Sequence, residues 1–165
     1  MTAAYDIRAA TPEDLVAIRE VLVTTWHATY DHVDGSEAVT RITDVWHALD
    51  VLRRQLDQPA SCCLVSTTAA GEIIATSFAL LQGDTINLSR IYILPEHQRR
   101  GLGAKILAAS LDALPGATRI TLEVSPENAS AIAFYERHGF ALVARTQNCG
   151  KPGSGLAALI YQKQL

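Results

Sequence analysis

A strand-like run and a helix-like run meet at a loop rich in arginine and glycine, and this junction constrains the fold more than any other segment. The run 91–93 is Ile-Tyr-Ile, and the loop 98–104 is Gln-Arg-Arg-Gly-Leu-Gly-Ala. A helix N-terminus presents unpaired backbone N–H groups and a partial positive charge, so it binds phosphate well. Gly101 and Gly103 would let a phosphate approach the backbone, and Arg99 and Arg100 would add positive charge. The junction predicts a strand–helix unit with a phosphate site where the helix begins.

The loop alone is not specific enough to establish that site. It lacks the third glycine of the dinucleotide-binding pattern, and no Gly-Lys-Ser/Thr follows as in a Walker A loop. A solvated helix start would be the simpler account of two glycines and two arginines. The assignment therefore needs support from another segment.

Hydrophobic periodicity predicts an alternating series of strands and helices. The residues Thr11-Pro12-Glu13-Asp14 are typical of a capped helix start. In that helix Leu15, Ile18, Leu22 and Trp26 form one apolar face, and in a second helix Val45, Leu49, Leu52 and Leu56 do the same. The expected strands are 5–9, 61–68, 72–81, 85–93, 118–124, 140–144 and 156–162, and the further helices are 45–56, 101–114 and 128–138. This order predicts an α/β fold with a mixed sheet flanked by helices, in a single domain over residues 1–165.

Composition narrows the class of protein. Hydrophobic residues make up 48% of the chain and charged residues 19%, as in an ordinary globular protein. The formal net charge of -3 disfavours a nucleic-acid binder. The three cysteines, Cys62, Cys63 and Cys149, favour buried thiols over a disulfide framework, and no His/Cys spacing is typical of a metal site. Without a signal peptide or an apolar span, we expect a cytoplasmic protein with no membrane, nucleic-acid or metal partner.

A second segment supplies the support that the loop needs. Residues 128–140 follow the pattern Asn-x-x-Ala-x-x-Phe-Tyr-x-x-x-Gly-Phe, and residues 98–103 follow Gln-x-x-Gly-x-Gly. Together these motifs closely resemble the GNAT superfamily of N-acetyltransferases, over the stretch from Thr85 to Phe140. The resemblance implies the GNAT fold, with a mostly antiparallel sheet that splays between the strands ending near Ile93 and Val124.

The resemblance also implies an acetyl-CoA site in that wedge. The backbone of Ile91, Tyr92 and Ile93 would pair with the pantetheine arm. Asn128 would lie near that arm, and Tyr135 would reach the CoA sulfur. The loop that would hold the pyrophosphate comprises Gln98, Arg99, Arg100, Gly101, Leu102, Gly103 and Ala104.

Acetyl transfer to an amine requires a neutral amine, a stabilised oxyanion and a proton for the leaving thiolate. Tyr135 is the candidate general acid, and a backbone N–H near Ile93 is the candidate oxyanion donor. Glu123 is the candidate base, because ribosomal-protein N-terminal acetyltransferases of this superfamily have a glutamate twelve residues before the tyrosine. Two alternatives stay open: Tyr135 only packs in the core, or Glu123 is an outward carboxylate paired with Arg119 or Arg145.

The acceptor is not readable from the sequence. Trp26, Tyr30 and the glycine-rich stretch 147–155 are candidates for its pocket, although Trp26 also fits a simple extension of the helix face. The expected reaction is direct transfer of an acetyl group from acetyl-CoA to a primary amine, either a small molecule or a peptide or protein amine. A non-catalytic acyl-CoA-binding sensor is the alternative, and a homodimer is possible by analogy with the family.

Overall fold

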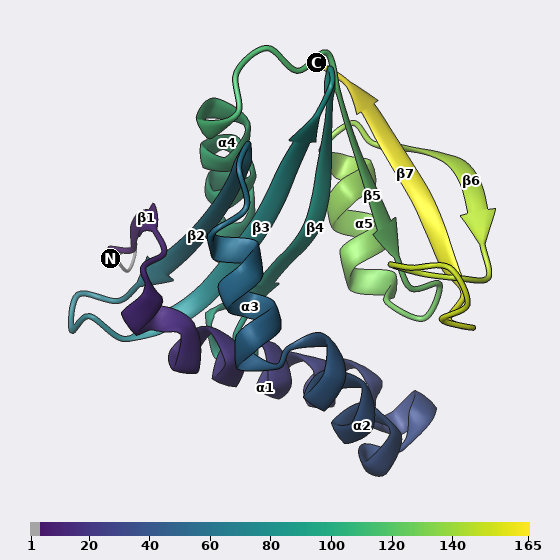
Figure 1. Ribbon diagram of the computed structural model, residues 1–165, viewed down its shortest axis with the longest axis horizontal. Coiled ribbons are helices and arrows are strands. Elements are labelled where there is room, and N and C mark those ends of the chain that lie inside the picture. The colour runs from purple at the N-terminus through teal and green to yellow at the C-terminus, as the bar shows by residue number, and fades with distance from the viewer. Residues whose placement is uncertain (1–3) are drawn as a thin grey trace.

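One seven-stranded sheet forms the centre of the molecule, with helices on both of its faces (Figure 1). The computed structural model describes residues 4–165. The strand order is β1-β2-β3-β4-β5-β7-β6, and every neighbouring pair is antiparallel except β4 and β5. The strands are β1 (Asp6–Ala9), β2 (Ser61–Thr67), β3 (Ile73–Gln82), β4 (Thr85–Ile93), β5 (Arg119–Val124), β6 (Ala141–Thr146) and β7 (Ala158–Gln164). The α-helices are α1 (Leu15–Asp34), α2 (Ser36–Trp46), α3 (Leu49–Leu56), α4 (Leu102–Ala113) and α5 (Ala129–Arg137). The predicted α/β fold with a mixed, mostly antiparallel sheet is confirmed.

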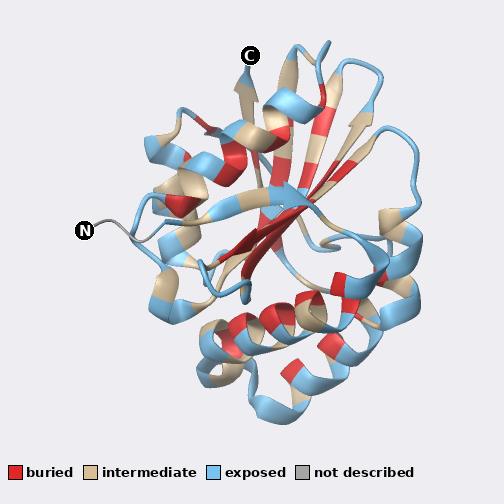
Figure 2. Cartoon of the chain, turned by 90° about the vertical axis from the view of Figure 1, so that its left-hand side faces the viewer, coloured by how far each residue is buried: buried red, intermediate tan, exposed pale blue. Residues whose placement is uncertain are grey.

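The hydrophobic core lies on both faces of the sheet, where the buried residues of Figure 2 gather. On one face, Leu22 of α1 and Leu52 of α3 pack against Val65 of β2. On the other face, α4 and α5 pack over the central strands, with Leu107 and Tyr135 among Leu88 and Leu122. Burying aliphatic side chains on both faces holds the helices at fixed positions, and thereby places the loops between them.

The predicted single helix over 45–56 was wrong. The chain forms two helices there, α2 and α3, separated at Ala48, whose ψ of 145° is extended and cannot continue a helix. Val45 and Leu49 were expected on the buried face, but they are 59% and 45% exposed. Of the four apolar residues expected on this face, only Leu52 is deeply buried, at 2% exposure, because only a short stretch of α3 packs on the sheet.

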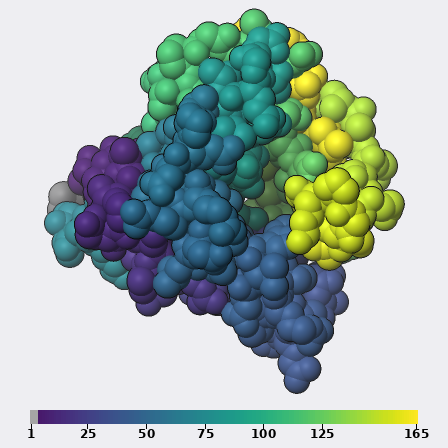
Figure 3. Space-filling model, viewed as in Figure 1, coloured from purple at the N-terminus to yellow at the C-terminus, as the bar shows by residue number. Residues whose placement is uncertain are grey.

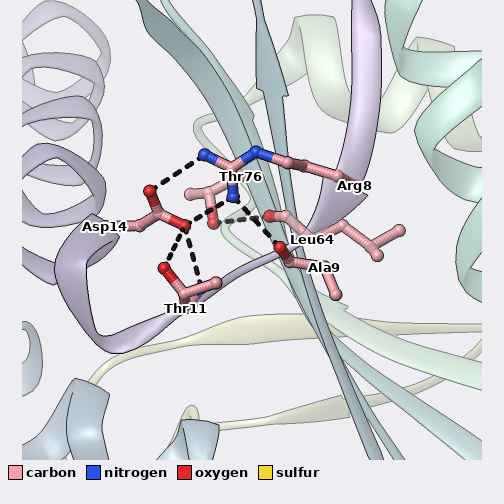
Figure 4. Close-up of polar contacts among 6 residues, drawn as sticks. All are labelled: Arg8, Ala9, Thr11, Asp14, Leu64 and Thr76. Atoms are coloured by element: carbon pink, nitrogen blue, oxygen red, sulfur yellow. Dashed lines mark hydrogen bonds and ion pairs between the residues drawn. The ribbon is translucent and has the colours of Figure 1, made fainter.

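The start of α1 is built as the sequence predicts. Thr11 donates its backbone N–H to the Asp14 carboxylate at 2.8 Å, and the Asp14 N–H returns a bond to the Thr11 carbonyl oxygen at 3.0 Å. Arg8 of β1 clamps the same carboxylate with two bonds of 2.7 and 3.0 Å (Figure 4). This contact ties the first strand to the first long helix.

The Asp14 contact predicts an acid-dependent loss of stability. Hydrogen bonding by Arg8 lowers the pKa of Asp14 from 3.8 to about 2. The stabilisation is therefore complete above the unfolded-state pKa and is lost as the pH falls through the folded value. We expect about 1–2 kcal/mol, reduced by screening because Arg8 is 40% exposed. Urea unfolding between pH 2 and 6 should show a smaller acid slope in Asp14→Asn than in the wild type. Asp57→Asn, which removes an exposed pair with Arg53, is the control, and equal slopes in the two variants would contradict this account.

Candidate active site

Strands β4 and β5 separate partway along their length and leave one edge of β4 open. Their parallel pairing covers only residues 85–88 against 119–122, although β4 continues to Ile93. The Leu94 N–H bonds the Ile74 carbonyl of β3 at 2.9 Å. Because backbone groups alternate between the two edges of a strand, those of Ile91 and Ile93 point away from β3, toward the gap. The predicted splay is confirmed, and it exposes hydrogen-bonding backbone inside the molecule.

A β-bulge controls which side chains of β4 face which helices. Between β3 and β4 the register passes from the Ala79–Leu88 pair to the Phe78–Arg90 pair, so Ser89 is the extra residue. After the bulge, Tyr92 packs with the core under α1 and α3, while Ile91 and Ile93 pack with α4. After the bulge, neighbouring side chains of β4 therefore point to opposite faces of the sheet, Tyr92 toward α1 and α3, and Ile91 and Ile93 toward α4.

The loop before α4 presents free backbone N–H groups at the end of this open edge. Gly101 adopts a φ of 78° and Arg99 a φ of 59°, and no atom lies within 4 Å of the position that a Gly101 Cβ would take. Within residues 4–165, the backbone N–H groups of 99–104 donate to no acceptor. Gln98 donates its side-chain amide to the Ile93 carbonyl at 2.8 Å, and Arg100 bonds the Glu96 carbonyl at 2.9 Å. The loop is therefore held by its own side chains, and its exposed N–H groups suit a phosphate.

The second glycine of the loop has a different structural reason. A Cβ on Gly103 would come within 3.0 Å of the Phe134 ring, so this glycine lets α4 and α5 approach closely. Leu102, which the sequence groups with the phosphate loop, is 1% exposed and anchors the start of α4 in the core. Helices α4 and α5 therefore pack closely against each other next to the loop.

Tyr135 lies on α5 with its ring among Phe134 and Phe140 and only 8% of its surface exposed. Burial raises its pKa, and the neighbouring Tyr30 raises it further. Burial also raises the pKa of Tyr92, with smaller contributions from Tyr30 and Tyr135. A tyrosine that stays protonated through the neutral range can donate a proton to a developing thiolate.

Asn128 connects two of these elements. Its side-chain oxygen accepts the Ala131 N–H at 3.2 Å and caps α5, while its amide donates to the Tyr30 hydroxyl at 3.4 Å. Tyr30, which the sequence offers as a candidate for the acceptor pocket, is 7% exposed and is held by this amide. A capping residue with a spare donor next to the gap positions both α5 and Tyr30.

Glu123 lies on the exposed face of β5. The core around Tyr135 packs against the other face of this strand. Its carboxylate accepts the Gly150 N–H at 2.7 Å and lies beside Cys149, whose pKa burial and Glu123 raise to about 12. The alternative pairing with Arg119 is wrong, because Arg119 bonds Asp84 and Thr85 instead. In the part of the chain that the structure describes, Glu123 has no ion-pair partner.

A cleft of about 1100 Å³ opens on this side of the sheet, between the helical segment α1–α3 and the loop joining β6 to β7 (Figure 3). The glycine-rich stretch predicted as a candidate lines it and reaches across to α2, where Gly150 lies against the Trp46 ring. Trp26 packs on Tyr30, Trp46 and His47 at ring separations of 4.9, 5.8 and 5.6 Å. The cleft is lined, among others, by Tyr30, Trp46, His47, Gln55, Arg90, Tyr92, Glu123 and Cys149.

Two histidines near the site make local contacts. His138 bonds the Phe134 carbonyl at 2.7 Å at the end of α5, and His97 bonds the Tyr5 hydroxyl at 3.1 Å. Sequence reasoning missed Arg90, His47 and Gln55, which all line the cleft. The signal for Arg90 was present, since an arginine inside the apolar strand β4 is unusual.

Two features are absent from residues 4–165. No group of three or more metal-ligating side chains comes together there. Nor is any helix in this range both long enough and apolar enough to cross a membrane.

Comparisons with known proteins agree with this geometry. A model described as "Acetyltransferase (GNAT) family" matches residues 17–140. The [ribosomal protein bS18]-alanine N-acetyltransferase of Escherichia coli K12 is 37% identical over 75 residues, which cover 44% of this chain and 51% of that protein. The peptidyl-lysine N-acetyltransferase YjaB of Salmonella typhimurium is 31% identical over 86 residues, covering 51% and 55%. The chain thus spans about half the length of the curated relatives it matches.

Among solved structures, the PaiA N-acetyltransferase of Thermoplasma acidophilum, solved in complex with coenzyme A, superposes with a TM-score of 0.84. The two chains share 21% identity, and the match covers 98% of this chain and 99% of the other. At that identity the likeness shows the fold. The family model, however, matches residues 17–140, well over half of the sequence, and this span includes the splayed strands, the loop 98–104 and Tyr135. The chain belongs to the acetyltransferase (GNAT) family.

Proposed function

We propose that this protein transfers an acetyl group from acetyl-CoA to a primary amine by direct attack. The main support for the proposal is the open edge of β4, which ends at a loop of unbonded N–H groups and whose Ile91 packs against the hydrophobic cluster that contains Tyr135. Acetyl-CoA supplies an activated acetyl thioester. The loop 98–104 would bind its pyrophosphate, and the backbone of Ile91 and Ile93 would pair with its pantetheine arm.

The residues around the gap divide the remaining work. The Ile93 N–H would stabilise the developing oxyanion. As the new C–N bond forms and the C–S bond breaks, Tyr135 would give its proton to the leaving thiolate sulfur. Glu123, held by the Gly150 N–H, would accept the proton of the ammonium through a water. The amine itself would enter by the cleft on the other side of the sheet, whose wall includes Tyr30, Tyr92 and Glu123.

Release of free CoA thiol tests the proposal. Purified protein with acetyl-CoA and a thiol reagent should release thiol at a rate that depends on an added amine. Release at the same rate without any amine would indicate a thioesterase, and acetyl-CoA binding without any release would favour the sensor alternative.

The base role predicts a loss of activity for Glu123→Gln. We expect kcat/KM for an alkylamine to fall about a hundredfold, because the amide cannot accept the ammonium proton. Glu127→Gln is the control, since Glu127 lines the same cleft. Steady-state kinetics of both variants with one acceptor would measure the effect. Equal rates for Glu123→Gln and the wild type would remove Glu123 from the mechanism and leave deprotonation to solvent.

A further inference from the structure

Arg90 is a buried cation that no anion accompanies. It is 6% exposed, and no carboxylate in residues 4–165 lies within ion-pair distance of it. Its guanidinium donates to the Gln55 side-chain oxygen at 2.6 Å and lies 5.3 Å from the centre of the Phe78 ring. Its Nε atom is buried and has no partner in the described chain. A guanidinium stays protonated in proteins, so this arrangement leaves an uncompensated charge, which is costly.

The neighbours of Arg90 do not provide the missing anion. The Cys63 sulfur lies 4.0 Å from its Nη2, but burial raises the pKa of that thiol, which therefore remains neutral. Burial likewise raises the pKa of Tyr92, the next residue on the same face of β4. The structure thus supplies polar contacts to Arg90 but no negative charge.

Arg90 lies where a ligand can reach it. The bulge at Ser89 turns Arg90 and Tyr92 to the same side of the sheet, and both line the cleft. His47 lines it as well, with both ring nitrogens buried and unbonded. Burial and the charge of Arg90 lower the pKa of His47 to about 4, so its ring is neutral and offers one N–H donor. A fixed cation and a neutral donor in one cleft match a carboxylate.

We propose that Arg90 binds a carboxylate carried by the amine acceptor, with His47 as a second donor. The inference rests on the proposed acetyl transfer and narrows its substrate class to amines that carry an acid group. Arg90 precedes Tyr92 by two positions, or roughly 7 Å along the strand. Arg90, Tyr92 and the candidate base Glu123 line one cleft, so the amine and the carboxylate should be only a few bonds apart. A free amino acid or an acidic residue at the start of a peptide would both meet this requirement.

Matched acid and amide acceptors test the proposal. Amino acids would be compared with their carboxamides, and short peptides beginning with Asp or Glu with peptides beginning with Asn or Gln, by mass-spectrometric initial rates. We expect kcat/KM to favour the acid of each preferred pair about ten- to a hundredfold, as for a charge-assisted bidentate contact. The two sets of pairs separate the small-molecule source from the peptide source. Equal rates for acid and amide in both sets would overturn the proposal, and this test requires no variant.

Replacing Arg90 tests whether this residue causes the preference for acid over amide acceptors. In Arg90→Met the acid-to-amide ratio should fall toward one, whatever the absolute rate. Arg54→Met is the matched control, because Arg54 lines the same cleft but is exposed and paired with Asp50, and there the ratio should persist. Loss of the ratio in the Arg54 variant with retention in the Arg90 variant would assign the site elsewhere.

Binding without turnover separates this proposal from the proposed function. N-acetylated amino acids and their carboxamides would be titrated calorimetrically into the wild-type protein in the presence of CoA. Tighter binding of the acids, without acetylation of any amine, would uphold the Arg90 site and refute the acetyltransfer. Acetylation of amines with no difference in binding between acid and amide ligands would uphold the acetyltransfer and refute the Arg90 site. A failure of both ligands to bind would also count against the site.

Discussion

Replacing Tyr135 with phenylalanine is expected to lower kcat at least about a hundredfold, while the affinity for acetyl-CoA changes little. The ring would keep its place among Phe134 and Phe140, so the fold and the donor site should remain intact. Only the proton donor near the departing sulfur would be lost. The expected signature is therefore a fall in kcat without a matching change in the dissociation constant of acetyl-CoA, from steady-state kinetics and calorimetry.

Tyr161→Phe is the matched control for this experiment. Tyr161 belongs to the same core and is 3% exposed, but its hydroxyl donates to Glu136 at 2.9 Å, away from the gap. This variant should lose some stability and keep its kcat. Unchanged kcat in Tyr135→Phe would restrict Tyr135 to a packing role, the alternative that its sequence position left open.

Replacing Gly101 with valine is expected to weaken acetyl-CoA binding about ten- to a hundredfold. The backbone at Gly101 has a φ of 78°, which a β-branched residue resists, and the side chain would project beside the free N–H groups of the loop. Losing one or two charge-assisted bonds to phosphate accounts for the expected size of the effect. Calorimetric titration of acetyl-CoA would measure it.

Gly116→Val separates donor binding from backbone strain. Gly116 follows α4, has a φ of 91° and likewise has no atom within 4 Å of its Cβ position. Both variants should lose comparable stability in thermal unfolding, but only Gly101→Val should lose affinity. A normal titration with Gly101→Val, or equal losses in both variants, would contradict the placement of the pyrophosphate.

Local patterns in the sequence predict most of the sheet and its flanking helices, because β2 and β3 are apolar runs buried on both faces, β5 alternates in burial, and α4 buries one face. The missed helix α2 shows where this reasoning stops. Val39, Ile42 and Trp46 do recur at helical spacing, but Val45 is exposed and the helix packs on α1 instead of the sheet. The break at Ala48 depends on how α2 and α3 dock, which is a property of tertiary packing.

The candidate site likewise contains some residues that local motifs predict and others whose position depends on tertiary packing. The loop 98–104, Asn128 and Tyr135 follow from contiguous motifs, and their roles toward acetyl-CoA stay predictions, as does the single domain over residues 1–165. The bond between Glu123 and the Gly150 N–H joins residues far apart in the chain, so no local pattern could indicate it. The position of the Arg90 side chain in the cleft depends on the bulge at Ser89. Without the bulge, regular alternation along β4 would place Arg90 on the other face of the sheet.

Isotope labelling would show whether the protein transfers an acetyl group from acetyl-CoA to an amine. The protein would be incubated with acetyl-CoA carrying a ¹³C-labelled acetyl group and a mixture of amino acids, polyamines, aminoglycosides and short peptides. We expect a labelled N-acetyl product on at least one amine class, formed by the wild type and strongly reduced in Tyr135→Phe. Labelled acetate as the only product, or no labelled product although calorimetry shows acetyl-CoA bound, would contradict it.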